Sequence, residues 1–296
     1  MLGHVRLNSS RTGLLAFIGL LAVTTPTLSQ THQSGIEKQK NFPRHSVQER
    51  VRRNLAEGLD DEDGIKQLFT MGDEAVPSLI KFLSDAGKDR RAGAARGLAY
   101  IGNQQGMQAL RNAVTFEKDE ETKAEMSCFL AGGLVQTKSE NDLDFLRSSV
   151  EKARFADDDE EVPAFCAVLA LGMRGTSDSL AILRKIPKEY LIDSDEIRKA
   201  IQWMENESTP GRVTVGRSSS EEEQIKKTVL DGTFFALEER DETSVTQLTF
   251  SPRRNKALVS LDIWGSSKSA ARGYHLVLAK ESGVWRVVGI WFAWVA

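Results

Sequence analysis

The sequence has little histidine and none of the common catalytic motifs. Four histidines are present, and none lies between His45 and His275. A phosphate-binding loop, a dinucleotide glycine motif, a Gly-x-Ser-x-Gly turn, a Cys-x-x-Cys pair and a His-Glu-x-x-His motif are all missing. A Ser-His-Asp arrangement would have to use His32, His45 or His275. We therefore expect a protein that is not an enzyme, with no catalytic residues, no metal ligands and no cofactor.

Positive charge is also not in excess. The chain has 39 Lys and Arg residues against 42 Asp and Glu residues, which gives a formal net charge of -3. General nucleic-acid binding needs a strongly basic face, so no nucleic-acid partner is expected. Hydrophobic residues are 40% and charged residues 27%, as in an ordinary globular protein, and 296 residues suffice for one or two domains.

Cysteine is equally scarce, with only Cys128 and Cys166 present. Two cysteines are too few to form the framework of a chain of this length. Two interpretations stay open. The cysteines form a disulfide if the chain enters an oxidising compartment, or they are two small buried hydrophobic side chains.

A long apolar run of the kind that spans a bilayer is missing, but a shorter one stands near the N-terminus. The 11 residues from Gly13 to Val23 are apolar and follow Arg6 and Arg11. A signal peptide has such a run of ~7–15 residues, whereas a membrane-spanning helix needs ~20. We expect a signal peptide over 1–29 with cleavage near Ser29, then a disordered linker over 30–44. This predicts export to the periplasm or the medium and no stable membrane span after cleavage; the alternative is an uncleaved anchor.

What the middle of the chain does contain is a repeated segment with a Leu-Arg pair. Its copies place the arginine at Arg111, Arg147 and Arg184, at intervals of 36 and 37 residues. Within Ala94–Val114, apolar residues recur three and four positions apart on both sides of Gly102, which predicts two helices joined by a turn. A period in the thirties predicts stacked helical pairs, because one pair cannot bury its apolar face alone.

Two prolines agree with helix starts in this region. Pro77 and Pro163 each follow acidic residues, and a first helical turn tolerates a missing N–H and favours negative charge. The acidic run Asp157–Glu161 lacks the alternating ligands and the glycine of a calcium loop. We interpret it as a solvated helix start rather than a metal site.

The stretch GDEAVPSLIKFLSDAGKDRRAGAARGLAYIG, from Gly72 to Gly102, resembles a HEAT or phycobilisome-lyase-type HEAT-like repeat. The features that match are AVPSLIKFL, a following arginine, and AARGLAYIG. The resemblance covers about Asp61–Met204. It implies a mainly α protein with an α-solenoid of about four helical pairs over 45–206. Some relatives are enzymes or chromophore lyases, and one group binds iron through His-Glu pairs, which this region lacks; most such repeats mediate binding.

The recurring arginines are the candidate partner-binding residues. Arg111, Arg147 and Arg184 occupy one position in the second helix of each expected pair, which in HEAT arrays usually lines the concave face. Three guanidinium groups in a row would suit an acidic protein partner. The alternative is that each arginine pairs with a neighbouring acid or caps an adjacent turn.

The composition changes after Met204. Residues 207–218 are polar and predict a linker. Ser219 and Glu222 have the spacing of a capping box at the start of a helix, and period-two alternation then begins near Asp241. The final strand, within Val284–Val295, is apolar on both faces, which suits a docked partner, a homodimer or packing on the helical region.

The segment GYHLVLAKESGVWRVVGIWF, which begins at Gly273, resembles the last hairpin of the nuclear transport factor-like, cystatin-like α+β roll. The resemblance covers about 219–296 and implies a small α+β domain with one helix on an antiparallel sheet. Enzymatic relatives usually place an Asp, His or Tyr in an enclosed pocket, which makes Asp262, Tyr274 and His275 the ligand-pocket candidates.

Together these features favour an exported, non-enzymatic protein–protein interaction or scaffold protein. It would bind an unidentified protein through the HEAT-like solenoid and use the C-terminal module for docking or dimerisation. The alternative is a small-molecule-binding or enzymatic module in the C-terminal roll, supported by the solenoid. A phycobilisome-lyase-like activity is a third hypothesis.

Overall fold

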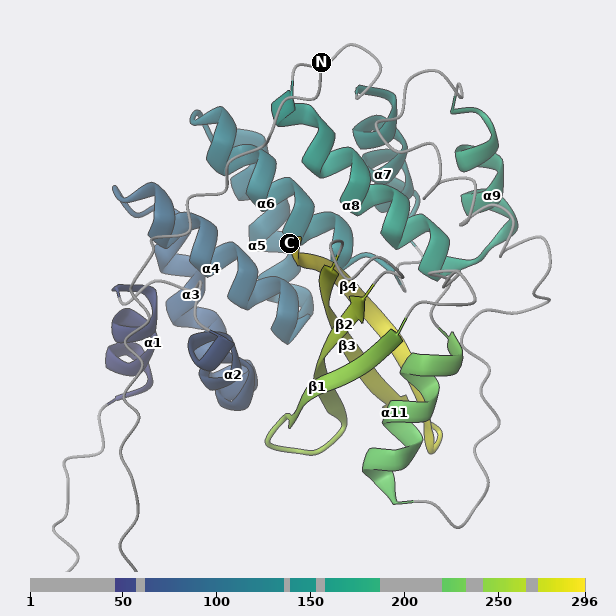
Figure 1. The fold of residues 1–296 in the computed structure, drawn as a ribbon. Coiled ribbons are helices and arrows are strands. Elements are labelled where there is room, and N and C mark those ends of the chain that lie inside the picture. Colours follow the sequence, from purple (N-terminus) through teal and green to yellow (C-terminus); the bar gives the residue numbers. More distant parts are fainter. Residues whose placement is uncertain are drawn as a thin grey trace, which may run out of the picture. The chain divides into compact units, whose positions relative to one another are not determined.

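A computed structural model describes residues 46–56, 62–135, 139–152, 158–186, 220–232, 242–264 and 271–295. The expected signal peptide over 1–29 and the expected linkers over 30–44 and 207–218 lie outside these residues. The described residues all belong to one compact unit of the chain. Within this unit, a helix-rich region is followed by a four-stranded antiparallel sheet (Figure 1).

The helical region consists of short helices. They are α1 (Val47–Ala56), α2 (Glu62–Met71), the 3-10 helix η1 (Gly72–Ala75), α3 (Val76–Phe82), α4 (Lys88–Ile101), α5 (Gln104–Phe116), α6 (Glu120–Gly132), α7 (Glu140–Lys152), α8 (Asp158–Arg174) and α9 (Ser177–Arg184). Helix α6 packs between α4 and α8, so that these three lie side by side (Figure 1). None of the helices described is long and apolar enough to cross a membrane.

The helix pair expected within Ala94–Val114 is confirmed as α4 and α5. Leu98 at the end of α4 and Leu110 in α5 are fully buried. Gly102 adopts a φ of +60°, a left-handed conformation that glycine enters without steric cost, and it ends α4. The side chain of Asn103 then accepts hydrogen bonds from two backbone N–H groups and caps α5.

The two prolines have different positions. Pro77 lies in the first turn of α3, as predicted. The prediction for Pro163 is wrong, because α8 begins at Asp158 and contains Pro163 in its interior. Pro163 lacks the N–H that would bond to the carbonyl four residues earlier. The carboxylates that open the helix offset part of this loss through the helix dipole, so the helix starts more than a turn before the proline.

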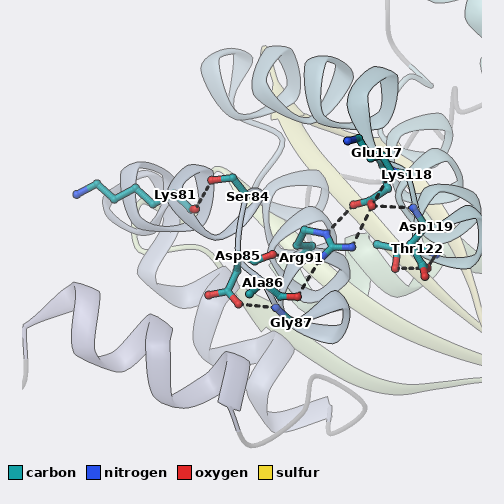
Figure 2. A network of polar contacts seen from close by, with 10 residues as sticks. All are labelled: Lys81, Ser84, Asp85, Ala86, Gly87, Arg91, Glu117, Lys118, Asp119 and Thr122. Atoms are coloured by element: carbon teal, nitrogen blue, oxygen red, sulfur yellow. Dashed lines mark hydrogen bonds and ion pairs between the residues drawn. The ribbon is translucent and has the colours of Figure 1, made fainter.

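Neighbouring helical pairs are also tied together by Arg91 in α4. Its guanidinium donates to the backbone carbonyls of Asp85 and Ala86 in the preceding loop. It also donates two hydrogen bonds, of 2.6 and 2.9 Å, to the carboxylate of Glu117 in the loop that follows α5 (Figure 2). This pairing holds the pKa of Glu117 below its usual value. One side chain thus connects two successive loops on the same side of the helices.

A disulfide joins Cys128 of α6 to Cys166 of α8. Both residues are buried, so the two open interpretations of the cysteines are both partly right: they lie in the core, and they are paired. The bond connects adjacent helices, and its two cysteines are 38 residues apart in sequence.

The C-terminal part begins with α11 (Glu221–Gly232). Ser220 and Glu223 form the capping box: the Ser220 hydroxyl accepts from the Glu223 N–H at 3.2 Å, and the Glu223 carboxylate accepts from the Ser220 N–H at 2.9 Å. The box therefore lies one residue later than the predicted Ser219 and Glu222, since consecutive serines and glutamates offer two registers. Ser219 itself lies outside the described residues.

The sheet is an antiparallel meander in the order β1-β2-β3-β4. Its strands are β1 (Glu242–Phe250), β2 (Lys256–Trp264), β3 (Ala271–Glu281) and β4 (Val284–Val295). A two-residue turn at Ser282 and Gly283, both at positive φ, joins β3 to β4 as the sequence predicts. Helix α11 packs on the sheet through β4 and β1, with Ile225 and Val229 fully buried.

A bulge in β4 changes which of its side chains share a face. Simple alternation places Val287 with Trp291 and Val288 with Ile290. In the structure, Val277 pairs with Gly289 and Leu278 with Val287, so Val288 is an extra residue. The bulge places Val287 and Ile290 on one face and Trp291 on the other. Trp291 shares this other face with His275, the residue of β3 with which it pairs.

Candidate binding groove

The sheet face that carries Trp291 and His275 meets the ends of the helices. The Trp291 indole N–H donates to the backbone carbonyl of Phe129 in the last turn of α6, at 2.9 Å. The Lys256 ammonium, in β2, donates to the carbonyls of Ile101 and Gly102 at the end of α4, with 3.3 Å to Gly102. The last carbonyls of a helix lack a partner within the helix, and Lys256 binds two of them at the end of α4. The Phe129 carbonyl also accepts from the Gly133 N–H at 3.2 Å, so Trp291 adds a second hydrogen bond to it.

The approach of β4 to α6 depends on Gly132. A Cβ atom at this position would lie 2.3 Å from the Ile290 carbonyl oxygen and 2.3 Å from the Trp291 indole nitrogen. Such distances are far inside van der Waals contact, so a side chain at Gly132 would push the strand away. Glycine here permits close packing of strand and helix.

A buried hydrogen bond joins the same two layers. The Tyr100 hydroxyl, in α4, lies 2.8 Å from Nδ1 of His275, in β3. Burial raises the pKa of Tyr100 to about 12. Burial, and next the positive charge of Arg96, lowers the pKa of His275 to about 4. Both groups are therefore neutral at neutral pH, and the pair serves as an uncharged contact.

Beside this contact the sheet and the helices diverge and leave an open groove of about 1080 Å³. Helix α5 forms one wall, and residues at the start of α7 also line the groove. The polar residues of these two segments that line the groove are Gln104, Gln105, Gln108, Arg111, Asn112, Ser139 and Asp142. The volume is at the upper limit of the ~300–1,000 Å³ typical of small-molecule sites.

Strands β3 and β4 supply the floor of the groove. The small or β-branched residues there are Val277, Ala279, Val288 and Gly289, and Trp291 of β4 also lines the groove. The Trp291 ring lies over Gly289, where a Cβ atom would be 2.3 Å from it. The bulge at Val288 leaves this side chain half-buried beside Gly289.

The charged groups in the groove already have hydrogen-bond partners. The Arg111 guanidinium contacts the Asp142 carboxylate, with Nε to Oδ1 at 2.6 Å and Nη2 to Oδ1 at 2.5 Å. The Asp142 side chain is only 5% exposed. Lys256 donates to the two carbonyls at the end of α4. Arg111 and Asp142 cancel each other, and Lys256 leaves a formal charge of +1, with its ammonium bonded to helix carbonyls and the carboxylate of Asp73 nearby.

The three predicted arginines lie on three different helices. Arg111 in α5 lines the groove and pairs with Asp142 on the neighbouring α7. Arg147 in α7 pairs with Asp144 one turn earlier, at 2.6 Å. Arg184 is the exposed last residue of α9. The first two thus have the neighbouring acids that the alternative interpretation expects, and only Arg111 is part of the groove.

The three C-terminal candidates are also divided. Asp262 in β2 and His275 in β3 lie on adjacent strands and on the same face of the sheet, the face toward the helices. Tyr274 projects from the opposite face and packs against Phe292, with ring centroids 5.6 Å apart. Burial raises the pKa of Asp262. None of the three lines the groove, which instead borders their neighbours Val277 and Ala279.

Sequence reasoning missed the residues that line the α5 wall. Four carboxamide side chains occur within nine positions there, at Gln104, Gln105, Gln108 and Asn112. They belong to a single helix and do not recur, so a search for repeated residues passes over them. Their spacing of three and four positions was the available signal.

Among the described residues, no three histidines, cysteines or acidic residues gather as a metal site would require. Comparison of the chain with protein-family models, with curated proteins and with solved structures found no match.

Proposed function

We propose that the chain is an exported, non-enzymatic protein that binds a protein partner in the groove between α5 and the sheet. The observation that carries this proposal is the groove itself, about 1080 Å³ in volume and open to solvent along a polar wall. Its size and openness suit part of a macromolecule better than an enclosed small ligand.

The state of the ionisable groups supports binding rather than catalysis. General acid–base chemistry needs a group that is free to exchange a proton with the substrate. In the groove, Arg111 and Asp142 pair with each other, Lys256 holds helix carbonyls, and Tyr100 bonds to His275. Each of these groups has a structural partner.

Export is supported by the leader-like N-terminus and by the disulfide. Disulfides form and persist in oxidising compartments such as the periplasm and the extracellular space. The Cys128–Cys166 bond joins two core helices and so has a structural role that depends on such a compartment.

We further propose that the helical region is a HEAT-like solenoid and that the C-terminal sheet completes its binding surface. The packing of α6 between α4 and α8 and the glycine turns at Gly72, Gly102 and Gly175, each at φ near +60°, are typical of stacked pairs. In this proposal the sheet acts as the second wall of the site.

Site-specific photocrosslinking tests the proposal. A photoreactive amino acid replaces Gln105 in the groove, and as the matched control it replaces Gln67, an exposed carboxamide on α2 outside the groove. We expect one crosslinked protein species in intact source cells for the groove position only, in the exported fraction. Equal crosslinking at both positions, or none at either, would contradict the proposal.

A further inference from the structure

We propose that the occupant of the groove is an uncharged polypeptide segment in an extended conformation, whose backbone amides are bound by the carboxamides of α5. This inference rests on the proposed function and specifies the chemistry of the partner. The residues concerned are Gln104, Gln105, Gln108 and Asn112, opposite the floor formed by Val277 and Ala279.

The hydrogen-bonding capacity of the wall matches a peptide backbone. A carboxamide carries one acceptor oxygen and two donor hydrogens, as an extended backbone alternates C=O and N–H groups. Gln104 and Gln105 are exposed, and in the described part of the chain no hydrogen bond involves their side chains. They therefore have donors and acceptors to offer to a partner.

The other two carboxamides are held in place. The Gln108 amide donates to the Asn112 oxygen at 3.2 Å, and the Gln108 oxygen accepts from Arg111 at 3.1 Å. Arg111 is itself fixed by Asp142 on α7. This chain of contacts orients Gln108 and Asn112 before a ligand arrives, which lowers the entropy lost on binding.

The dimensions agree with a short extended segment. Gln104 and Asn112 are about 12 Å apart along α5 at ~1.5 Å per residue. A strand rises about 3.3 Å per residue, so about four residues span the wall. Alternate side chains of such a segment would then face the small apolar residues of the floor, and the others would face solvent.

The charged groups of the groove already have partners, which favours an uncharged segment. Arg111 and Asp142 already neutralise each other, and Lys256 is directed at the carbonyls of Ile101 and Gly102. A charged ligand side chain would lose water and would have to displace the contacts that Arg111, Asp142 and Lys256 already make. Acidic and basic segments are therefore both disfavoured.

A glycan offers similar hydrogen-bonding groups, but the aromatic residues of the groove are not accessible to it. Tyr100 is 3% exposed and Trp291 is 1% exposed, and each bonds to the opposite layer. A sugar ring would find no exposed aromatic face to cover. The observations thus favour a peptide, and glycan binding becomes an outcome of the test.

The test uses a phage-displayed library of random linear octapeptides, selected on the full chain purified after export. We expect enriched peptides with few charged residues. Their affinity should fall at least tenfold in the variant Gln104→Ala/Gln108→Ala, and also when the central backbone amides of the peptide are N-methylated. The matched variant Gln48→Ala/Gln67→Ala removes two exposed carboxamides outside the groove and should change affinity less than twofold. Circular dichroism confirms that both variants fold.

Several results would overturn the inference. They are a consensus rich in charged residues, binding that both variants retain equally, tolerance of N-methylation, or the absence of enriched peptides. Groove-dependent binding of oligosaccharides on an array, without peptide binding, would replace the peptide by a glycan. If photocrosslinking at Gln105 captures a partner while no peptide is enriched, the proposed function stands and only the inference of an extended peptide ligand is refuted. If both experiments are negative, both proposals fail.

Discussion

The disulfide between Cys128 and Cys166 gives a quantitative prediction, because the chain has no other cysteine for a reductant to act on. Reduction releases a loop closed over 38 residues. In the chain-entropy description, the cross-link removes about 13 cal/mol/K from the unfolded state, or about 4 kcal/mol at 25 °C. We therefore expect reduction to lower the free energy of unfolding by about 4 kcal/mol, a large part of the ~5–15 kcal/mol of a typical domain.

Equilibrium unfolding in urea, followed by far-UV circular dichroism, measures this loss. With a slope of about 3 kcal/mol/M, the midpoint should fall by more than about 1 M on addition of dithiothreitol. The control is Cys128→Ala/Cys166→Ala, which should unfold near the reduced protein and should not respond to the reductant. An unchanged midpoint on reduction of the natural chain would refute the reasoning, as would two freely alkylated thiols in the exported protein.

The remaining predictions concern the contact between the sheet and the helices. The pKa of His275 is about 4 in the folded protein against 6.5 for an ordinary histidine, so the unfolded state binds the proton more tightly. The contribution of His275 to stability should be constant above pH 7 and should fall by about 3 kcal/mol in total as the pH drops from 6.5 to 4. In urea unfolding at a series of pH values, His275→Gln should lose this part of the slope, and an unchanged slope would contradict the assignment. Gly132→Ala should cost about 1–3 kcal/mol, because its Cβ meets backbone and indole atoms at 2.3 Å. The adjacent Gly133→Ala meets only the flexible end of Met107 at 2.7 Å and should cost less; equal thermal midpoints for the two variants would count against the close approach.

The helices and strands were largely predictable because their signals are local. The three- and four-residue spacing around Gly102 gave α4 and α5, and the alternation of β2 and β3 gave an antiparallel meander. Where the structure differs from the prediction, the local sequence was compatible with two starting positions for the helix. The capping box at Ser220 could start one residue earlier, and the helix that contains Pro163 could start before or at the proline.

The contact between sheet and helices was not predictable from the sequence. The Trp291 indole bonds to the carbonyl of Phe129, 162 residues earlier, and no periodicity connects them. A backbone carbonyl also has no sequence signature as an acceptor. The bulge at Val288 changes which face Trp291 occupies, so alternation alone assigns it incorrectly.

The candidate site was predicted only at Arg111. Recurrence selected Arg111, Arg147 and Arg184, but charge pairing is decided by which acid lies opposite each arginine in space. Asp142 fixes Arg111 from a neighbouring helix, and the groove beside it arises where small residues of β3 and β4 face α5. That arrangement follows from tertiary packing and not from any single repeat.

The way the sheet meets the helices also bears on how the chain can change length during evolution. Repeat arrays commonly gain or lose units, since each unit contacts only its neighbours. Here Lys256 holds the end of α4 while Trp291, on the same sheet, holds the end of α6. An extra helical pair inserted between them would separate these two carbonyl groups by about another 8–10 Å helix spacing, and a sheet of fixed width could no longer reach both. In the proposed HEAT-like array, the sheet would therefore fix the number of helical pairs between the ends of α4 and α6.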